Sequence, residues 1–167
     1  VCLEMSSLGK GDIREPFIEV TYPNGSSTTD MVFDRVEIIQ GKEEYDTLPG
    51  SYDDNGEVEQ LVIYLKDRNY NLTLELHYYV YEKCDIITRS AKLVNSGNES
   101  VRLERLMSMQ LDLNESDYEL SFFNGAWARE MNRSRIPIRA GKYVNESVTG
   151  TSSNRANPFF MIGRSST

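Results

Sequence analysis

The sequence has few of the residues from which metal sites and nucleophilic active sites are usually built. Among 167 residues it contains one histidine, His77, and two cysteines, Cys2 and Cys84, which lie far apart. A lone histidine and two distant cysteines do not make a tetrahedral zinc site. No phosphate-binding loop, dinucleotide fingerprint or nucleophile elbow is present either. We therefore expect no metal and no other cofactor.

Disulfide scaffolds and leader sequences are also missing. Two cysteines in a chain of this length are typical of reduced thiols, and no signal peptide is visible. We therefore expect a cytoplasmic protein. The chain begins at Val1 and not at a methionine, so we also expect an upstream portion, and whether a leader was removed with it stays open.

Basic residues are outnumbered by acidic ones. The chain has 18 lysines and arginines and 26 aspartates and glutamates, which give a net charge of −8 and a pI of about 4.8. A nucleic acid or an anionic membrane would be repelled at long range, and no apolar run approaches the ~18 residues of a membrane span. We expect neither as a partner, whereas a neutral sugar is compatible with the charge.

Apolar and polar residues alternate along two long segments. In the first, Leu72, Leu74, Leu76, Tyr78 and Val80 point to one side of a predicted strand, opposite Thr73, Glu75, His77, Tyr79 and Tyr81. The same alternation covers residues 101–113, and residues 85–94 between them predict a third strand. We expect these three strands to form an antiparallel meander with one apolar face and one wet face.

The remaining segments also favour strands. Shorter ones are predicted over residues 17–22, 31–40, 61–66, 118–123, 135–139 and 158–162, separated by turn signals such as Asn124-Gly125. No segment keeps helical apolar spacing over the length of a helix. The pattern predicts an all-β protein, an antiparallel β-sandwich over residues 17–167 preceded by a loop or arm over residues 1–16.

The most unusual part of the arm is Gly9-Lys10-Gly11-Asp12-Ile13-Arg14-Glu15-Pro16. Glycines allow a backbone to approach a partner closely, and proline restricts how the loop leaves. Asp12 and Arg14 are therefore candidates for hydrogen bonds to sugar hydroxyls. The alternative is an internal Asp12–Arg14 pair that staples the loop.

A second candidate segment surrounds the single tryptophan. Trp127 follows the Asn124-Gly125 turn signal and stands between two alanines, with Arg129 close behind. Its indole would suit a partner surface or the C–H face of a sugar, and it would suit a core position equally well.

Conventional catalytic groups are harder to assemble. His77 could belong to a serine triad, but this is the less favoured interpretation. The more favoured one is that His77 is simply a residue of the polar strand face. Carboxylates are plentiful, but sequence does not show any two of them facing each other across a cleft, as glycoside hydrolysis requires.

Six segments occur in an order that resembles the N-terminal domain of α-galactosidases (melibiases) of glycoside hydrolase family 36. They are Gly-Asp-Ile-Arg-Glu-Pro (11–16), Asp-Ile-Ile-Thr-Arg-Ser (85–90), Leu-Glu-Arg (103–105), Asp-Tyr-Glu-Leu (117–120), Gly-Ala-Trp-Ala-Arg-Glu (125–130) and Gly-Thr-Ser-Ser-x-x-x-Asn-Pro-Phe (150–159). The resemblance runs from about residue 9 to residue 160.

The resemblance implies a β-supersandwich of the galactose-mutarotase type, followed by a (β/α)₈ barrel and a small sheet domain. It implies hydrolysis of terminal α-galactosyl residues in melibiose- or raffinose-type sugars with retention, by two barrel aspartates that this chain lacks. On this basis the chain is a non-catalytic and incomplete sandwich.

The resemblance also implies roles for single residues. In tetrameric bacterial members the arm reaches the active site of a neighbouring subunit, which makes Asp12, and after it Arg14, candidate substrate-pocket residues. Trp127 and Arg129 become candidate interface residues. The chain departs from the family at Ile13, where Phe is common, and at residues 154–156, where His occurs, so the role of the 150–158 loop stays open.

Two other functions remain compatible with the sequence. One is a freestanding carbohydrate-binding sandwich. The other is a purely structural assembly module in which Asp12 and Arg14 touch no sugar.

Overall fold

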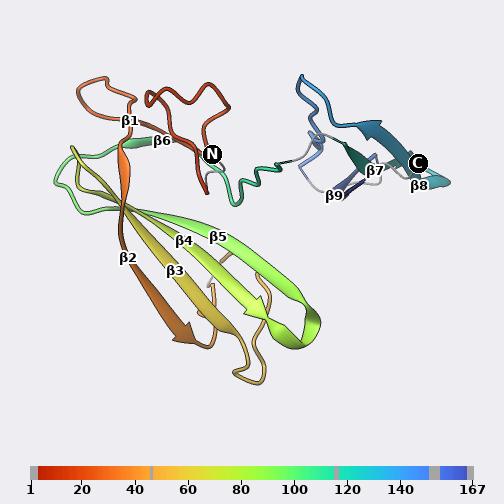
Figure 1. Cartoon of the computed structure of the whole chain (residues 1–167), viewed down its shortest axis with the longest axis horizontal. Helices are drawn as coiled ribbons and strands as arrows, with labels where there is room; N and C mark the ends of the chain where they lie inside the picture. The colour runs from red at the N-terminus through yellow and green to blue at the C-terminus, as the bar shows by residue number, and fades with distance from the viewer. Residues whose placement is uncertain (1–3, 46, 115–116, 151–154, 165–167) are drawn as a thin grey trace. The chain divides into compact units, whose positions relative to one another are not determined.

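The regular secondary structure of the described residues is almost entirely antiparallel strand, as predicted. The computed structural model describes residues 4–45, 47–114, 117–150 and 155–164. It divides into two compact units, Val1–Asp112 and Leu113–Thr167, and Figure 1 shows the strands of each. The predicted boundary between residues 16 and 17 stays a prediction.

The described part of the first unit forms two sheets. A small one pairs β1 (Ile18–Thr21) with β6 (Arg102–Leu106). The larger sheet is a meander in the order β2-β3-β4-β5, formed by β2 (Met31–Gln40), β3 (Glu59–Asp67), β4 (Leu72–Tyr81) and β5 (Ile86–Asn95). The short 3₁₀ helix η1 (Glu82–Cys84) connects β4 to β5.

The predicted three-stranded meander is wrong in its third strand. Instead of continuing to residue 113 beside β5, β6 ends at Leu106 and pairs with β1, with Ile18 opposite Leu106. The Met107 N–H then donates to the carbonyl of Phe17. Alternation predicts that a segment is a strand but does not predict its partner, because the partner is decided by which apolar side chains are buried together.

The core of this unit lies between the β1–β6 pair and one face of the meander. Phe17, Ile18 and Val20 are fully buried, and they pack with Leu72, Leu74 and Leu76 of β4. Each such side chain contributes roughly 1.5–3 kcal/mol when it is fully removed from water. The apolar face predicted for β4 is therefore a core face at this end of the strand.

Part of the polar face of β4 is buried as well, contrary to the prediction that this face is wet. His77 is 6% exposed and Tyr79 1% exposed, because the segment that joins β2 to β3 folds over them. From this segment the Tyr45 hydroxyl lies 2.7 Å from the Tyr79 hydroxyl and 2.6 Å from Ser90 Oγ. Burial raises the pKa of Tyr79, and Tyr45 raises it further.

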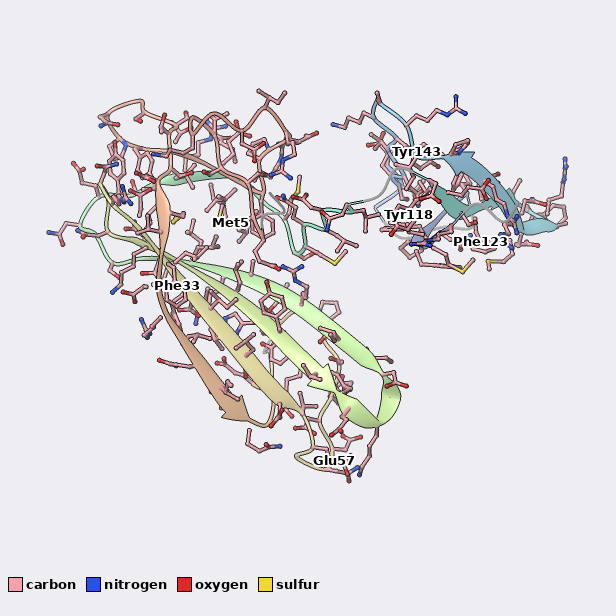
Figure 2. The ribbon with its side chains drawn as sticks, viewed as in Figure 1. Met5, Phe33, Glu57, Tyr118, Phe123 and Tyr143 are labelled. Atoms are coloured by element: carbon pink, nitrogen blue, oxygen red, sulfur yellow. The ribbon has the colours of Figure 1, made fainter. Side chains whose placement is uncertain are left out.

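The second unit is a three-stranded sheet in the order β8-β7-β9, formed by β7 (Tyr118–Ala126), β8 (Arg129–Pro137) and β9 (Ala156–Arg164). Ring contacts hold it together: Phe123 stacks on Phe159 at 4.9 Å between centroids, and Phe122 meets Tyr143 at 4.7 Å. Figure 2 labels Tyr118, Phe123 and Tyr143 in this unit. Residues 151–154 of the 150–158 loop lie outside the described residues.

The predicted Asn124-Gly125 turn is also wrong. Both residues belong to β7, and the reversal falls at Trp127 and Ala128, between the paired residues Ala126 and Arg129. Positive φ angles of 58° at Ala128 and 56° at Met131 accommodate the turn and a bulge that follows it. β8 consequently starts at Arg129 instead of at the predicted residue 135.

Candidate functional site

The candidate site is the N-terminal arm of the first unit, residues 4–16. Its first part is anchored to β1 through Ser6, which is buried. The Phe17 N–H lies 3.0 Å from both the carbonyl oxygen and the hydroxyl oxygen of Ser6. The Ser6 hydroxyl in turn donates to the carbonyl of Glu15 at 3.0 Å. The two ends of the arm are therefore tied together at its base.

Gly9 is a position where the backbone of the arm passes close to the rest of the unit. Its φ is +88°, and a Cβ added there would lie 2.5 Å from Thr28 Oγ1. Lys10 next to it forms an ion pair of 3.0 Å with Asp30. Glycine is needed at residue 9 for both backbone angle and space, which accounts for one of the two glycines in the motif.

Asp12 and Arg14 bind each other. The Arg14 Nε donates to Asp12 Oδ1 at 2.9 Å and its Nη2 to Asp12 Oδ2 at 2.7 Å, a two-pronged pair. The backbone N–H of Arg14 adds a third bond to Oδ1 at 3.0 Å. This is the internal staple that the sequence left as an alternative.

Asp112 is the third member of the cluster, and the sequence did not indicate it. Arg14 Nη1 donates to Asp112 Oδ2 at 2.5 Å across 98 positions of sequence. Asp112 lies in the segment that follows β6, and it reaches Arg14 because residues 107–112 are not the predicted strand. Nothing local in the sequence signals this contact. We call Asp12, Arg14 and Asp112 the arm clamp.

The arm clamp is connected to the meander through the segment that carries Asp112. Gln110 Nε2 donates to Asp112 Oδ1 at 3.3 Å, and Arg89 Nη1 of β5 donates to the Gln110 carbonyl at 3.1 Å. Arg89 also donates from Nη2 to Glu4 at 2.9 Å and to the Tyr78 hydroxyl at 2.9 Å. Burial, together with the hydrogen bond to Glu4, raises the pKa of Tyr78 to about 12.

The hydrogen bonds of the arm clamp favour the ionised form of Asp12. Hydrogen bonds from the side chain and backbone of Arg14 lower the Asp12 pKa from 3.8 to about 2, so its carboxylate holds no proton to donate at neutral pH. Asp12 and Asp112 raise the pKa of Arg14 in turn. Between the two clamped residues, Ile13 projects with an exposure of 101%. The apolar tip of the arm is thus the part that is free to meet a partner.

Trp127 occupies a very different position in the second unit. Its indole is 91% exposed at the tip of the β7–β8 turn, so the core position that the sequence allowed is wrong. The Ala128 N–H donates to Glu130 at 3.0 Å, and the carbonyl of Arg129 accepts from Asn132 at 2.7 Å. These bonds fix the turn while leaving the Trp127 ring outside.

His77 does not belong to a triad. Its Nδ1 lies 2.9 Å from Gln60 Nε2 and its Nε2 lies 3.1 Å from Glu75 Oε2, so both ring nitrogens are occupied by groups that are not nucleophiles. Among the described residues, no group of three or more His, Cys, Asp or Glu side chains is arranged to hold a metal ion. A helix long and apolar enough to cross a bilayer is likewise not found in the described part of the chain.

Similar proteins agree on one family. The model of the "Glycosyl hydrolase family 36 N-terminal domain" matches residues 1–167. Alpha-galactosidase AgaA of Geobacillus stearothermophilus is 38% identical over 160 residues, which is 95% of this chain and 22% of AgaA. The chain therefore spans about a fifth of the length of such relatives.

Solved structures share the fold as well. The α-galactosidase from Lactobacillus brevis superposes with a TM-score of 0.91 at 40% identity, over 96% of this chain and 22% of that one. A variant of AgaA in complex with raffinose gives a TM-score of 0.89 at 38% identity, over 94% and 22%. Because the family model covers every residue and the fold agrees, the chain belongs to the glycosyl hydrolase family 36 N-terminal domain family.

Proposed function

We propose that this chain is the N-terminal domain of an α-galactosidase that hydrolyses terminal α-galactosyl residues of raffinose- or melibiose-type sugars with retention. The observation that carries the proposal is the family match over all 167 residues together with relatives that are named α-galactosidases and are about five times longer. The two catalytic carboxylates would belong to the barrel, and the location would be cytoplasmic.

Within that enzyme, we propose that the arm forms part of the substrate pocket of a neighbouring subunit in a homotetramer. The support is geometric. The arm is tied at its base by Ser6, stiffened by the arm clamp and ends in the exposed Ile13. Preorganisation of this kind reduces the entropy lost when a loop meets a ligand.

The structural-module alternative also has an observation in its favour. Both carboxylate oxygens of Asp12 and all the donors that Arg14 uses are directed within the arm clamp. In this alternative the arm clamp holds the arm for assembly and no sugar reaches it.

The activity itself is tested first. The full-length protein is assayed with a chromogenic α-galactoside, and we expect turnover with retention of anomeric configuration. Absence of turnover in a folded full-length protein contradicts the proposal.

The role of the arm is tested by Asp12→Ala in the full-length enzyme, with Asp54→Ala as a control on an exposed turn. We expect KM to rise about tenfold with kcat within about twofold, because ground-state and transition-state binding are lost equally, while the tetramer stays intact. Unchanged KM with a weakened tetramer would favour the structural module.

A further inference from the structure

A polar cavity lies on the face of the meander that the β2–β3 segment partly covers. It has a volume of about 470 Å³, and Gln40, Gln60, Glu75 and His77 are among the residues that line it. Small-molecule sites usually have volumes of roughly 300–1,000 Å³. The cavity is therefore large enough for a small ligand. We call it the meander cavity.

A chain of hydrogen bonds runs through three of the side chains that line the meander cavity. Gln60 Nε2 lies 2.9 Å from His77 Nδ1, and His77 Nε2 lies 3.1 Å from Glu75 Oε2. Gln60 and His77 are both buried. When the amide donates to Nδ1, the proton of a neutral imidazole is on Nε2, from which it is donated to Glu75. Each side chain of the chain is thus held in a fixed orientation.

The two ends of this chain leave acceptor oxygens open. Gln60 and Glu75 form their bonds through Nε2 and Oε2, and no described residue hydrogen-bonds to the Oε1 atom of either. Among the described residues that are not exposed, Thr29 Oγ1 is the one buried side-chain polar atom without a partner, so both Oε1 atoms reach open space. Gln40 repeats the pattern, because its Nε2 donates to backbone carbonyls and its Oε1 accepts from no described residue. Three acceptor oxygens are therefore available to a ligand.

The charges around the meander cavity cancel. Its lysines and glutamates, within the described part of the chain, are Lys42, Lys92, Glu43 and Glu75, and Lys92 Nζ lies 3.6 Å from Glu75 Oε2. Acceptor oxygens disfavour an anion, because they require a ligand that donates hydrogen bonds. The two ammonium groups disfavour a cation. A neutral ligand with several hydroxyl groups meets both conditions.

Apolar surface is also present in the meander cavity. Ile39, Val62 and the ring of Tyr64 line it. The Arg35 guanidinium lies 3.6 Å from the centroid of the Tyr64 ring, and the Tyr64 hydroxyl donates to Glu37 at 3.0 Å, so the ring is held in place. Aliphatic and aromatic side chains beside a few polar groups are typical of small-molecule sites, and they suit the C–H surface of a sugar ring.

We propose that the meander cavity binds a neutral saccharide, whose hydroxyl groups donate to Gln40, Gln60 and Glu75. A purely structural role accounts for the bonds from Gln60 to His77 and from His77 to Glu75, but it does not account for three acceptors left open at one cavity. The inference does not rest on the hydrolysis proposed above, because every contact it uses belongs to this chain.

Carboxyl labelling in the full-length protein tests the proposal. Glu75 is modified with a water-soluble carbodiimide and glycine ethyl ester, with and without galactose or glucose at about 100 mM, and the rate is followed by peptide mass spectrometry. We expect one of the sugars to slow the labelling about tenfold, which is the protection given by a site with a Kd of about 10 mM. Glu99, which is exposed and does not line the meander cavity, is the internal control and should label at an unchanged rate.

A matched pair of variants links this protection to the meander cavity. Gln60→Met removes one acceptor and keeps the length of the side chain, and we expect the sugar concentration for half protection to rise about fivefold. Gln110→Met makes the same change at a residue that does not line the cavity and should leave this concentration unchanged. Gln40→Met replaces Gln60→Met if that variant does not fold.

Three results would overturn the proposal. The first is labelling of Glu75 that neither sugar slows, and the second is protection that the two variants change equally. The third is labelling of Glu75 without sugar that is slower than about a hundredth of the rate at Glu99, because the cavity would then be closed in the full-length protein. The readout does not involve hydrolysis, so absence of the proposed α-galactosidase activity and absence of protection are separate results.

Discussion

The arm and the β7–β8 turn both carry residues that the sequence singled out, but the two regions present them in opposite ways. In the arm, the charged residues Asp12 and Arg14 are bound to each other and to Asp112, and the apolar Ile13 projects. At the turn, the large aromatic Trp127 projects and the backbone around it is held by local hydrogen bonds. In the arm, the charged residues fix the local conformation. In both regions, the exposed apolar side chain is the one that is available to contact a partner.

The turn offers the largest expected effect. Trp127→Ala in the full-length enzyme should weaken subunit association by about 2 kcal/mol or more, because exposed tryptophans are frequent hot spots of interfaces. The melting temperature of the separated subunit should not change, since the indole is not packed in this unit. Sedimentation equilibrium measures the association.

Val148→Ala, another largely exposed apolar residue of the same unit, is the matched control and should associate normally. If Trp127→Ala associates as tightly as the control, the turn is not an interface. The exposed Trp127 then no longer distinguishes the turn from the arm as a region that contacts a partner.

Within the arm, we expect the largest loss of stability from a substitution at Gly9. Gly9→Ala places a Cβ 2.5 Å from Thr28 Oγ1 at a φ of +88°, and we expect the free energy of unfolding to fall by about 2–3 kcal/mol. Chemical denaturation measures it.

Gly11→Ala separates the two causes of that loss. Gly11 has a φ of +82° with no atom near its missing Cβ, so it reports the backbone term alone, about 1 kcal/mol. Equal losses for the two variants would show that the arm does not press against Thr28 in solution.

The arm clamp is expected to give a smaller effect that appears in substrate binding. Arg14→Gln breaks the contacts to Asp12 and Asp112 together, and we expect KM for an α-galactoside to rise about tenfold as the arm loses its fixed shape. Arg14→Lys keeps the charge but loses the two-pronged geometry, and about a threefold rise is expected.

Hydrogen exchange at residues 10–14 should increase in the same order. Faster exchange with an unchanged KM would show that the arm clamp stabilises the arm without contributing to substrate binding. The arm and the turn around Trp127 would then differ in that only the turn contacts a partner.

The smallest effect is the pH dependence of the arm clamp. The Asp12 pKa is lowered from 3.8 to about 2 in the folded chain, so the stabilisation by the Asp12–Arg14 pair is fully present above about pH 4 and is lost as the pH falls through 2. The carboxyl ¹³C shift of Asp12 should titrate with a midpoint near 2. A midpoint near 4 would mean that the pair is open in solution.

The strands that the sequence predicted best are those with strict alternation. The predicted range 31–40 coincides with β2, the alternation over residues 72–81 coincides with β4, and β5 is shifted by one residue at each end from the predicted range 85–94. The all-β fold class followed from this pattern, whereas the family was indicated separately, by the resemblance of six short segments in a fixed order. A period of two is a local property, and local sequence is sufficient to define it.

Partners and burial could not be derived in the same way. That β6 pairs with β1, that His77 and Tyr79 are covered by the β2–β3 segment and that Asp112 meets Arg14 all depend on residues far away in the sequence. The sequence by itself determined that the chain is built from strands, where most of those strands lie, and which family the chain resembles. Only the tertiary structure decided which face is inside and which charges are occupied, because burial and ion pairing are relations between distant segments, whereas alternation is a relation between neighbours.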